Sequence, residues 1–385
     1  MDAIKNAVNV VLGRKPSGSK VRYAVVGAGN ISQESFMPGV GQTSNSILTA
    51  LVTDDNEKYV KLARQYNLKS YKYADFNKLL DEDVCDAIYI GTPNWMHQEF
   101  AVPALEKGYH VLLEKPMEVN EEACVAINEA QKKTGAKLMV AYRLHFETGT
   151  LTVLDRVRKG DLGEPRIFTS TFVQVVKEEN HRAKHGAGPV PDLGPYPINA
   201  VRNLFGMEPI EVSAVGFKTP GREALQMEHD TVSVTLRFPG DRTAQFTVGY
   251  SGGPIDTYTI VGDKGYIEVT PCYMFGSGVK IAYKAKIEEK EESKTFSEVD
   301  QFGGETDYFS NCILKDQYPE PDGEEGFLDV RVIMAIKKAL ETGQTQKLEP
   351  KQRSKKPTLD QKRNLSMAST PKEFIGRDAD HPTET

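Results

Sequence analysis

The stretch VRYAVVGAGNIS, residues 21–32, sets the fold that the rest of the chain follows. Its first half is rich in β-branched and aromatic residues and predicts a buried strand, and its second half has the glycines of a sharp turn into a helix. Gly27 and Gly29 occupy the first two positions of the dinucleotide fingerprint, and Ser32 occupies the third, where glycine is usual. Backbone N–H groups at such a turn can bind a pyrophosphate. The serine adds a β-carbon and a hydroxyl, so we expect slightly looser packing of the helix there.

Strand and helix patterns alternate from residue 21 to about residue 145. After the first strand we expect strands at residues 47–52, 87–90, 109–113 and 137–141, and helices at residues 56–66, 75–80, 95–107 and 121–133. Strands that alternate with helices predict a parallel, doubly wound sheet of the Rossmann type. Such a sheet binds ligands at the carboxyl ends of its strands, so the residues that follow each strand are the candidates for function.

The pattern changes after about residue 145. Residues 231–238, TVSVTLRF, alternate polar and apolar side chains with period two, as expected of a sheet with one solvent-facing side. Turns at residues 239–242 and 262–265 each join two such strands into a hairpin. The second region is therefore predicted to be an α+β domain with an open, mainly antiparallel sheet, and helical patterns return in it at about residues 305–314 and 324–340.

Length and composition predict more than one domain. At 385 residues the chain exceeds what one hydrophobic core usually supports. We divide it into an N-terminal arm (residues 1–20), a dinucleotide-binding domain (21–145), a substrate and oligomerisation domain (146–342) and a polar C-terminal tail (343–385). The arm is expected to begin with a short amphipathic helix. The tail is rich in polar residues and proline, so we expect it to be disordered or draped over a neighbour.

Charge and composition argue against several classes of function. A net charge of -6 leaves no basic excess to displace phosphate counterions, so nucleic-acid binding is not expected. No run of about 18 apolar residues occurs, so no membrane association is expected. The four cysteines are far apart in the sequence, which suits reduced thiols and a cytoplasmic location. His181 and His185 are four residues apart, but no carboxylate or thiol stands at metal-binding spacing, so we expect no metal.

The end of the second strand, Thr53-Asp54-Asp55, decides which dinucleotide the turn would bind. An acidic residue there takes the ribose hydroxyls of NAD, whereas a small polar residue with a nearby cation takes the 2′-phosphate of NADP. Thr53 and Lys58 favour NADP, and Asp54 or Asp55 favours NAD. Alternatively, both aspartates cap the next helix. These residues alone leave the choice open.

Glu114-Lys115-Pro116 places a lysine at the end of a strand that is predicted to be buried, YHVLL, residues 109–113. A partly desolvated lysine exchanges protons nearer neutral pH, so Lys115 is a candidate for catalysis. The structural alternative is a polar strand exit, in which Pro116 ends the ladder and both charged side chains lie in water.

Asp192 and Tyr196 are four residues apart near the start of the second region. At that spacing they share one face of a helix, so a carboxylate and a phenol can both point into a cleft between domains. The structural alternative is an N-cap aspartate and a core tyrosine.

Several separated motifs, in order, resemble the glucose-fructose oxidoreductase, inositol dehydrogenase and rhizopine-catabolism (GFO/IDH/MocA) family of oxidoreductases. The resemblance spans about residues 21–342 and is closest to the glucose-fructose oxidoreductase branch. The motifs are Ala24-Val25-Val26-Gly27-x-Gly29, Pro93-Asn94-x-x-His97-x-Glu99-Phe100-Ala101, Glu114-Lys115-Pro116-Met117, Ala141-Tyr142-Arg143, Asp192-Leu193-Gly194-x-Tyr196 and Gly323-Glu324-Glu325-Gly326.

This resemblance implies a function and a site. Lys115 matches the family's catalytic lysine, Tyr196 the tyrosine that takes the proton of the sugar hydroxyl, and Asp192 the acid that orients the substrate; Arg143 also matches a position that lines the cleft. Lys115 and Tyr196 would form a proton-handling pair. NADP(H) becomes the first choice of cofactor, with NAD(H) as the alternative. The residues expected to contact it are Gly27, Gly29, Asn30, Ile31, Thr53, Lys58, Thr92, Pro93, Asn94, His97, Glu114, Lys115 and Arg143.

The implied activity is hydride transfer between a sugar and nicotinamide in a homo-oligomer, a dimer or tetramer built through the second-domain sheet. Oxidation of one sugar and reduction of another on a retained cofactor is a variant of this activity. An NAD-dependent cyclitol dehydrogenase or glycosidase and a non-catalytic dinucleotide sensor are the alternatives. Residues 177–188 are shorter than in the glucose-fructose oxidoreductase branch and differ from it, which leaves the substrate and coupled sugar exchange open.

Overall fold

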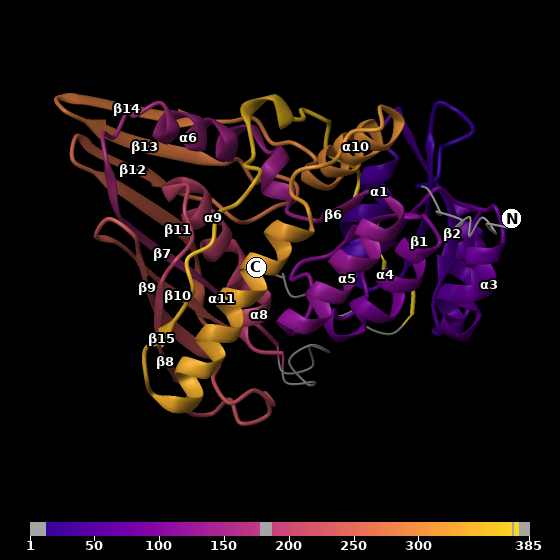
Figure 1. Ribbon diagram of the computed structural model, residues 1–385, viewed down its shortest axis with the longest axis horizontal. Coiled ribbons are helices and arrows are strands. Elements are labelled where there is room, and N and C mark those ends of the chain that lie inside the picture. The colour runs from indigo at the N-terminus through magenta and orange to yellow at the C-terminus, as the bar shows by residue number, and fades with distance from the viewer. Residues whose placement is uncertain (1–12, 178–186, 372, 377–385) are drawn as a thin grey trace, which may run out of the picture.

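The first sheet forms around the strand at residues 21–26. The computed structural model describes residues 13–177, 187–371 and 373–376, and it contains a six-stranded sheet of order β3-β2-β1-β4-β5-β6 with every pair parallel (Figure 1). The strands are β1 (Val21–Val26), β2 (Ser46–Val52), β3 (Lys69–Tyr71), β4 (Ala87–Ile90), β5 (His110–Leu113) and β6 (Leu138–Val140). This is the order of a doubly wound dinucleotide-binding sheet, whose ligand crevice lies where the strand order reverses, between β1 and β4. The predicted parallel fold is confirmed.

Helices pack on both faces of this sheet. Alternate residues of β1 face opposite layers: Ala24 and Val26 join the apolar cluster under α3, α4 and α5, whereas Tyr23 and Val25 join the cluster under α1. The helical segments are η1 (Ser32–Phe36), α1 (Met37–Val40), η2 (Lys58–Leu62), α2 (Ala63–Tyr66), η3 (Tyr73–Asp75), α3 (Phe76–Asp81), η4 (Asn94–Met96), α4 (His97–Glu106) and α5 (Glu121–Thr134). Each predicted helix is present, with ends shifted by a few residues.

The second sheet has nine strands in the order β14-β13-β12-β11-β7-β10-β9-β8-β15. Neighbouring strands are antiparallel except β7 and β10, so the prediction of an open, mainly antiparallel sheet is confirmed. The predicted hairpins join β9 to β10 and β11 to β12. The strands are β7 (Pro165–Val175), β8 (Glu211–Phe217), β9 (Thr231–Phe238), β10 (Arg242–Gly249), β11 (Ser251–Gly262), β12 (Gly265–Val269), β13 (Ala282–Ile287), β14 (Lys290–Thr295) and β15 (Gln346–Lys347).

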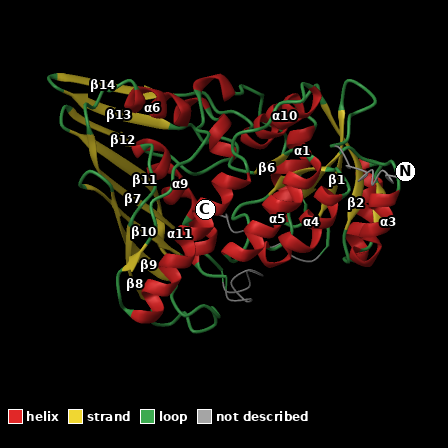
Figure 2. Cartoon of the chain, in the orientation of Figure 1, coloured by secondary structure: helices red, strands yellow, loops and turns green. Residues whose placement is uncertain are grey.

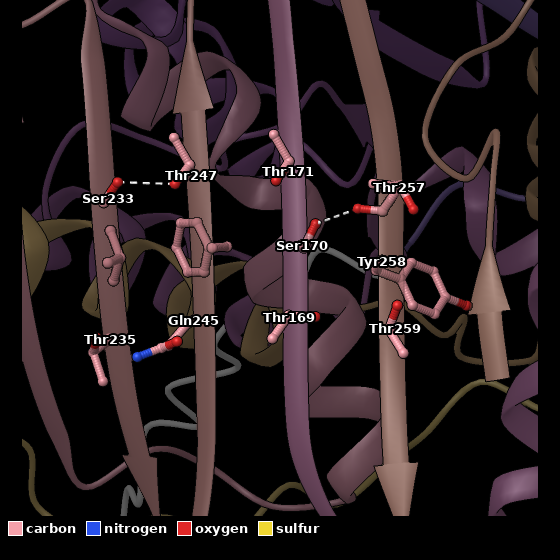
Figure 3. A pocket seen from close by; sticks show the side chains of 12 residues that line it. Thr169, Ser170, Thr171, Ser233, Thr235, Gln245, Thr247, Thr257, Tyr258 and Thr259 are labelled. Carbon is pink, nitrogen blue, oxygen red and sulfur yellow. Dashed lines mark hydrogen bonds between the residues drawn. The ribbon is translucent and has the colours of Figure 1, made fainter. Parts of the chain in front are cut away.

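The two faces of the second sheet differ. One face packs against helices and carries the apolar residues of the alternating pattern (Figure 2). The helices on this side are α6 (Thr148–Arg158), α8 (Pro189–Leu193), α9 (Pro195–Phe205) and α11 (Gly323–Thr342). The outer face carries threonine and serine side chains from β9, β10, β7 and β11, which line a shallow hollow of about 370 Å³ (Figure 3). Within the described residues no helix covers this outer face (Figure 2).

Helix α10 (Gln301–Leu314) returns to the first sheet and packs against α1 and β1. A β-carbon on Gly39 would lie 2.8 Å from the Gly303 backbone nitrogen, so a glycine is needed for α1 and α10 to approach so closely. We predicted that this helix would begin near residue 305, but it begins at Gln301, where Asp300 caps it by accepting the Gly303 N–H at 2.7 Å. Two glycines in its first turn lower the local helix propensity, and packing against α1 stabilises the turn despite them.

The C-terminal tail differs from the prediction of a disordered or neighbour-draped segment. Its described residues pack along the chain's own surface, and the yellow end of the ribbon runs from α11 back toward α10 (Figure 1). Gln361, in the short helix η6 (Leu359–Gln361), is buried and donates to the Glu320 carboxylate at 2.8 Å. Arg353, 3% exposed, ion-pairs with buried Glu325. Composition alone predicts disorder for this segment because it counts the charged residues but does not show which of them form buried ion pairs.

The predicted helix of the N-terminal arm lies outside the described residues. From Gly13 onward the arm runs at the edge of the first sheet where its strands begin: Gly13 donates to the Thr134 carbonyl at 3.0 Å and Arg14 to the Gly108 carbonyl at 2.8 Å. None of the described helices is long and apolar enough to cross a bilayer. The four cysteines are buried and free.

Candidate functional site

One cavity of about 1100 Å³ opens along the carboxyl ends of the first sheet and reaches the helical side of the second. Loops after β1, β2, β4 and β5 form one wall, as expected of a doubly wound sheet. Helices α8 and α9 and strand ends of the second sheet form the other wall. Of the residues predicted to form the site, His97 alone does not line this cavity.

The glycine turn has the geometry that the fingerprint requires. Gly27 has φ 79°, and a β-carbon there would lie 2.8 Å from the Thr92 backbone nitrogen, so only glycine fits. A β-carbon on Gly29 would meet no atom within 4 Å, which leaves open space beside the turn. The expected looser packing at Ser32 is not found: its hydroxyl donates to the Gly27 carbonyl at 2.8 Å, and Gly91 supplies the room.

The loop after β2 shows what the two aspartates do. Asp55 caps the next helix, because its carboxylate accepts the N–H groups of Glu57 at 2.9 Å and Lys58 at 3.0 Å. Asp54 accepts the Tyr73 N–H at 2.9 Å. Both aspartates therefore bind backbone groups, and both line the cavity together with Thr53 and Lys58.

The wall after β4 fits a polar group of a dinucleotide. The Thr92 hydroxyl oxygen is buried and has no hydrogen-bond partner among the described residues, although Thr92 lines the cavity. Pro93 and Asn94 line it as well. This hydroxyl, with the open space at Gly29, fits a bound cofactor.

His97 lies behind this wall, not in it. It is 1% exposed, and its ring nitrogens are 3.1 Å from the Met117 and Thr92 carbonyl oxygens. The ring therefore ties the loop after β4 to the loop that carries Lys115. Its place differs from the cofactor contact predicted from the resemblance, because the side chain points back between two backbone segments.

Lys115 reaches from the first wall to the second. Its ammonium donates to the Asp192 carbonyl at 2.8 Å and lies 3.7 Å from the Asp192 carboxylate. Both side chains remain partly exposed, at 14% and 18%. Glu114 also lines the cavity but is nearly buried, and its carboxylate accepts the Tyr89 hydroxyl at 2.9 Å.

The hydroxyl of Tyr196 is paired with Arg143, not with the predicted partner Lys115. The Arg143 guanidinium donates to this hydroxyl at 3.0 Å. It also donates to the Tyr273 carbonyl and the Gln301 side chain. The Lys115 ammonium lies over the Tyr196 ring instead, 4.7 Å from its centroid. Tyr196 thus has a cation at its oxygen and another at its face.

Tyr250 was not predicted as a site residue. It follows β10 and donates from its hydroxyl to the Asp192 carboxylate at 2.8 Å. The hydroxyl thereby holds the carboxylate that faces Lys115. The available signal was its inward position at the end of an alternating strand, which indicates burial but no particular partner.

A second unpredicted residue, Glu305, lies behind Glu114. It is fully buried, and neither carboxyl oxygen has a hydrogen-bond partner among the described residues. Burial, together with the neighbouring Glu114 carboxylate, raises the pKa of Glu305 well above its ordinary value. Burial therefore favours the neutral form of the Glu305 carboxyl.

No group of three or more His, Cys, Asp or Glu side chains in the described part of the chain could hold a metal ion. His181 and His185 lie outside those residues.

Two family profiles match this chain. The profile described as an oxidoreductase family with an NAD-binding Rossmann fold matches residues 21–142, and the GFO/IDH/MocA C-terminal domain profile matches residues 127–268. The chain belongs to the GFO/IDH/MocA oxidoreductase family. The resemblance inferred from the motifs is confirmed, and this GFO/IDH/MocA member is an enzyme of the oxidoreductase class.

Two of the similar proteins are named for sugar substrates. The crystal structure of aldose-aldose oxidoreductase from Caulobacter crescentus, complexed with glycerol, superposes with a TM-score of 0.80 at 31% identity and covers 86% of this chain and 100% of that one. D-Xylose 1-dehydrogenase [NADP(+)] from Haloarcula marismortui is 28% identical over 86% of this chain and 93% of its own. A 3-ketoreductase from Actinomadura kijaniata, solved with NADP and TDP-benzene, has a TM-score of 0.76 at 21% identity, covers 83% of this chain and 98% of that one, and shares the fold.

Proposed function

We propose that this chain is an NADP-dependent oxidoreductase that transfers hydride between a carbon of an aldose or related polyol and the nicotinamide. The observation that carries the proposal is one cavity shared by the glycine turn and by Lys115, Asp192 and Tyr196. The names of the two relatives with sugar substrates support the substrate class. When bound, the nicotinamide accepts hydride from the substrate carbon or returns it.

The loop after β2 supports NADP over NAD. Backbone N–H groups already donate hydrogen bonds to the carboxylates of Asp54 and Asp55, as described above. Thr53 and Lys58 then supply a hydroxyl and an ammonium for the 2′-phosphate. The Haloarcula relative is named as an NADP(+) enzyme.

The side chains on the second wall handle the proton. Oxidation of a hydroxyl removes a proton from oxygen as hydride leaves carbon, so the alcohol and NADP⁺ become the carbonyl, NADPH and one proton. In our proposal Tyr196 acts as a phenolate, which Arg143 stabilises from 3.0 Å away, and the phenolate oxygen accepts this proton to become the phenol. The Lys115 ammonium offsets charge at the substrate oxygen, and Asp192 holds both the lysine and a substrate hydroxyl.

The test begins with the purified protein. It is denatured, and any released nicotinamide is identified; aldoses and cyclitols are then screened with NADP⁺ and NAD⁺ by the absorbance of the reduced nicotinamide. We expect NADP(H) and turnover of an aldose. Cofactor binding without turnover of any substrate would favour the sensor alternative, and turnover of a cyclitol with NAD⁺ would favour the cyclitol dehydrogenase; absence of both binding and turnover would refute the proposal.

Substitutions assign the roles. Lys115→Ala is expected to abolish the chemical step while cofactor stays bound, and Tyr196→Phe to lower turnover greatly. Lys137→Ala is the matched control, because Lys137 also pairs with a carboxylate, Asp316 at 2.6 Å, and lies over the Tyr318 ring, yet lines no part of the cavity. Wild-type rates in both site variants would refute the assignment.

We also propose a homo-oligomer, a dimer or tetramer, that forms through the outer face of the nine-stranded sheet. That face is rich in Thr and Ser (Figure 3). Near its edge, β8 carries Val215, 73% exposed, and Phe217, 56% exposed. Thr171→Glu, at the centre of the face, should lower the mass measured by sedimentation, whereas Thr342→Glu at the end of α11 should not. Equal masses for all three proteins would contradict this interface.

The proposal includes a cytoplasmic location. The four buried cysteines are free thiols, and a reducing compartment keeps them so.

A further inference from the structure

The described part of the C-terminal tail crosses the molecule and reaches the glycine turn and the loop after β2. Asp300, the cap of α10, holds it midway: the Asp300 N–H donates to the Leu365 carbonyl at 3.0 Å, and its carboxylate accepts the Ala368 N–H at 3.1 Å. From there the chain reaches Ile375, beside the helix that follows the glycine turn. The tail is thus anchored before its last described residues begin.

Gln33 joins the end of the tail to the glycine turn. Its side-chain carbonyl accepts the Ile375 N–H at 2.9 Å, and its amide donates to the Ile375 carbonyl at 3.0 Å. The same amide nitrogen lies 3.0 Å from the Ala28 carbonyl, inside the fingerprint. Gln33 is 3% exposed, and the Ile375 side chain packs against the apolar cluster under α1. A glutamine that pairs with both backbone groups of one residue fixes that residue as a strand partner would.

The next residue touches the loop predicted to select NADP. A β-carbon on Gly376 would lie 2.7 Å from the Asp55 carboxylate and 2.8 Å from Cγ of Lys58, so the tail backbone lies directly against both side chains. Asp55 and Lys58 line the cavity, and Lys58 is 4% exposed. The described tail therefore lies against two of the side chains that line the cavity where it would hold the 2′-phosphate.

The described part of the N-terminal arm does not reach this rim. Gly13 and Arg14 bond to carbonyls at the opposite edge of the first sheet. Arg14 is also paired there with Asp83 at 3.2 Å. Of the two described chain ends, the C-terminal one is in contact with the cofactor site.

We propose that residues 373–376 form a cofactor clasp: they close the adenosine end of the pocket, so that NADP(H) dissociates only after Ile375 and Gly376 lift away from Gln33 and Lys58. This inference rests on the proposed function, which supplies the NADP. A clasp of this kind slows dissociation. One sugar can then give hydride to NADP⁺ and a proton to Tyr196, and a second sugar carbonyl can receive both before the cofactor leaves.

The test measures how fast NADPH leaves the enzyme. The protein is loaded with NADPH, mixed with excess NADP⁺, and the loss of bound nicotinamide fluorescence is followed by stopped flow. Two variants open the clasp: a chain that ends at Pro371, and Ile375→Asp in the full chain. We expect both to release NADPH about tenfold faster or more, which corresponds to loss of about 1.4 kcal/mol of contact.

A control variant separates the clasp from the rest of the tail. Ser354 lies earlier in the tail and does not line the cavity. Ser354→Ala removes the hydrogen bond from its hydroxyl to the Glu324 carboxylate. It should release NADPH at the wild-type rate. The unfolding midpoint without cofactor is recorded for each protein, and cofactor-free midpoints close to wild type show that the variants fold.

Different results bear on the two proposals. Wild-type protein that binds NADPH, with unchanged release in both clasp variants, overturns the clasp and leaves the proposed function intact. Wild-type protein that binds no nicotinamide cofactor overturns both. Faster release in the Ser354→Ala variant as well overturns the clasp, because any loosening of the tail would then suffice.

Discussion

Removal of the Tyr250 hydroxyl tests whether the second wall positions the catalytic groups. In the Tyr250→Phe variant the Asp192 carboxylate loses its 2.8 Å donor. A hydrogen bond to a charged group is worth about 1.5–3 kcal/mol, and Asp192 is 18% exposed, so water can replace part of it. We therefore take the lower value, about 1.5 kcal/mol, and expect kcat/KM for the aldose to fall about tenfold.

The assay is steady-state reduction of NADP⁺ with whichever aldose the screen identifies. Tyr283→Phe is the matched control: the Tyr283 hydroxyl also bonds to a carboxylate, that of Glu292, in the same sheet but outside the cavity. A double-mutant cycle adds the decisive comparison, because Tyr250→Phe should have no further effect once Asp192→Ala has removed the acceptor. A wild-type kcat/KM in Tyr250→Phe, or an undiminished effect in the Asp192→Ala background, would refute the positioning role.

Three further outcomes follow from single residues. Lys58→Ala should weaken NADP⁺ binding about tenfold or more and leave NAD⁺ binding nearly unchanged in fluorescence titrations, since it removes a cation from the 2′-phosphate. Glu305→Gln should change the urea-derived unfolding free energy by less than about 1 kcal/mol, because burial favours the neutral form of the carboxyl that it replaces; a larger loss would contradict the raised pKa of Glu305. Burial lowers the pKa of His110 to about 4, below its value in the unfolded chain, so the stability that the neutral imidazole contributes is complete above about pH 6.5 and is lost as the pH falls toward 4. Over that range the unfolding free energy of wild type should fall by about 3 kcal/mol more than that of His110→Gln in acid titrations of stability. Equal falls would contradict the lowered pKa of His110.

Sequence predicted the fold best where local pattern and burial agree. β4 and β5 are buried at every position, so their apolar runs are unbroken, and β9 alternates because one face is wet. β3 was not predicted, because three residues with one buried side chain carry too little pattern. β14 is exposed at all six positions and forms only because β13 offers it an edge. Strands of this kind depend on a partner and not on their own residues.

The site divides in the same way. Lys115, Thr53 and the glycine turn follow strands of a known topology, so their convergence on one edge could be inferred from the sequence. The partner of Tyr196 could not be inferred. Arg143 follows β6 of the first sheet, whereas Tyr196 belongs to α9, which packs on the second sheet. The distance of 3.0 Å between the two side chains therefore depends on how the two sheets pack against each other. No spacing in the sequence records that relation.

Residues remote from the cavity determine how the two sheets pack relative to each other. Helix α11 contacts α5 on the first sheet and β8 on the second, and its Glu325 lies in a buried cluster with Arg202 of α9 and Arg353 of the tail. Helix α9 also carries Tyr196 in its first turn. Removal of one partner from a buried ion pair destabilises a protein by several kcal/mol, because the other charge is left buried without compensation. A displacement of α9 would separate these pairs in the same way, so the cluster fixes the position of the helix. The tail therefore contacts the surroundings of the cavity at two places: Arg353 pairs with Glu325 beside the helix that carries Tyr196, the proposed proton acceptor, and Ile375 pairs with Gln33 beside the glycine turn.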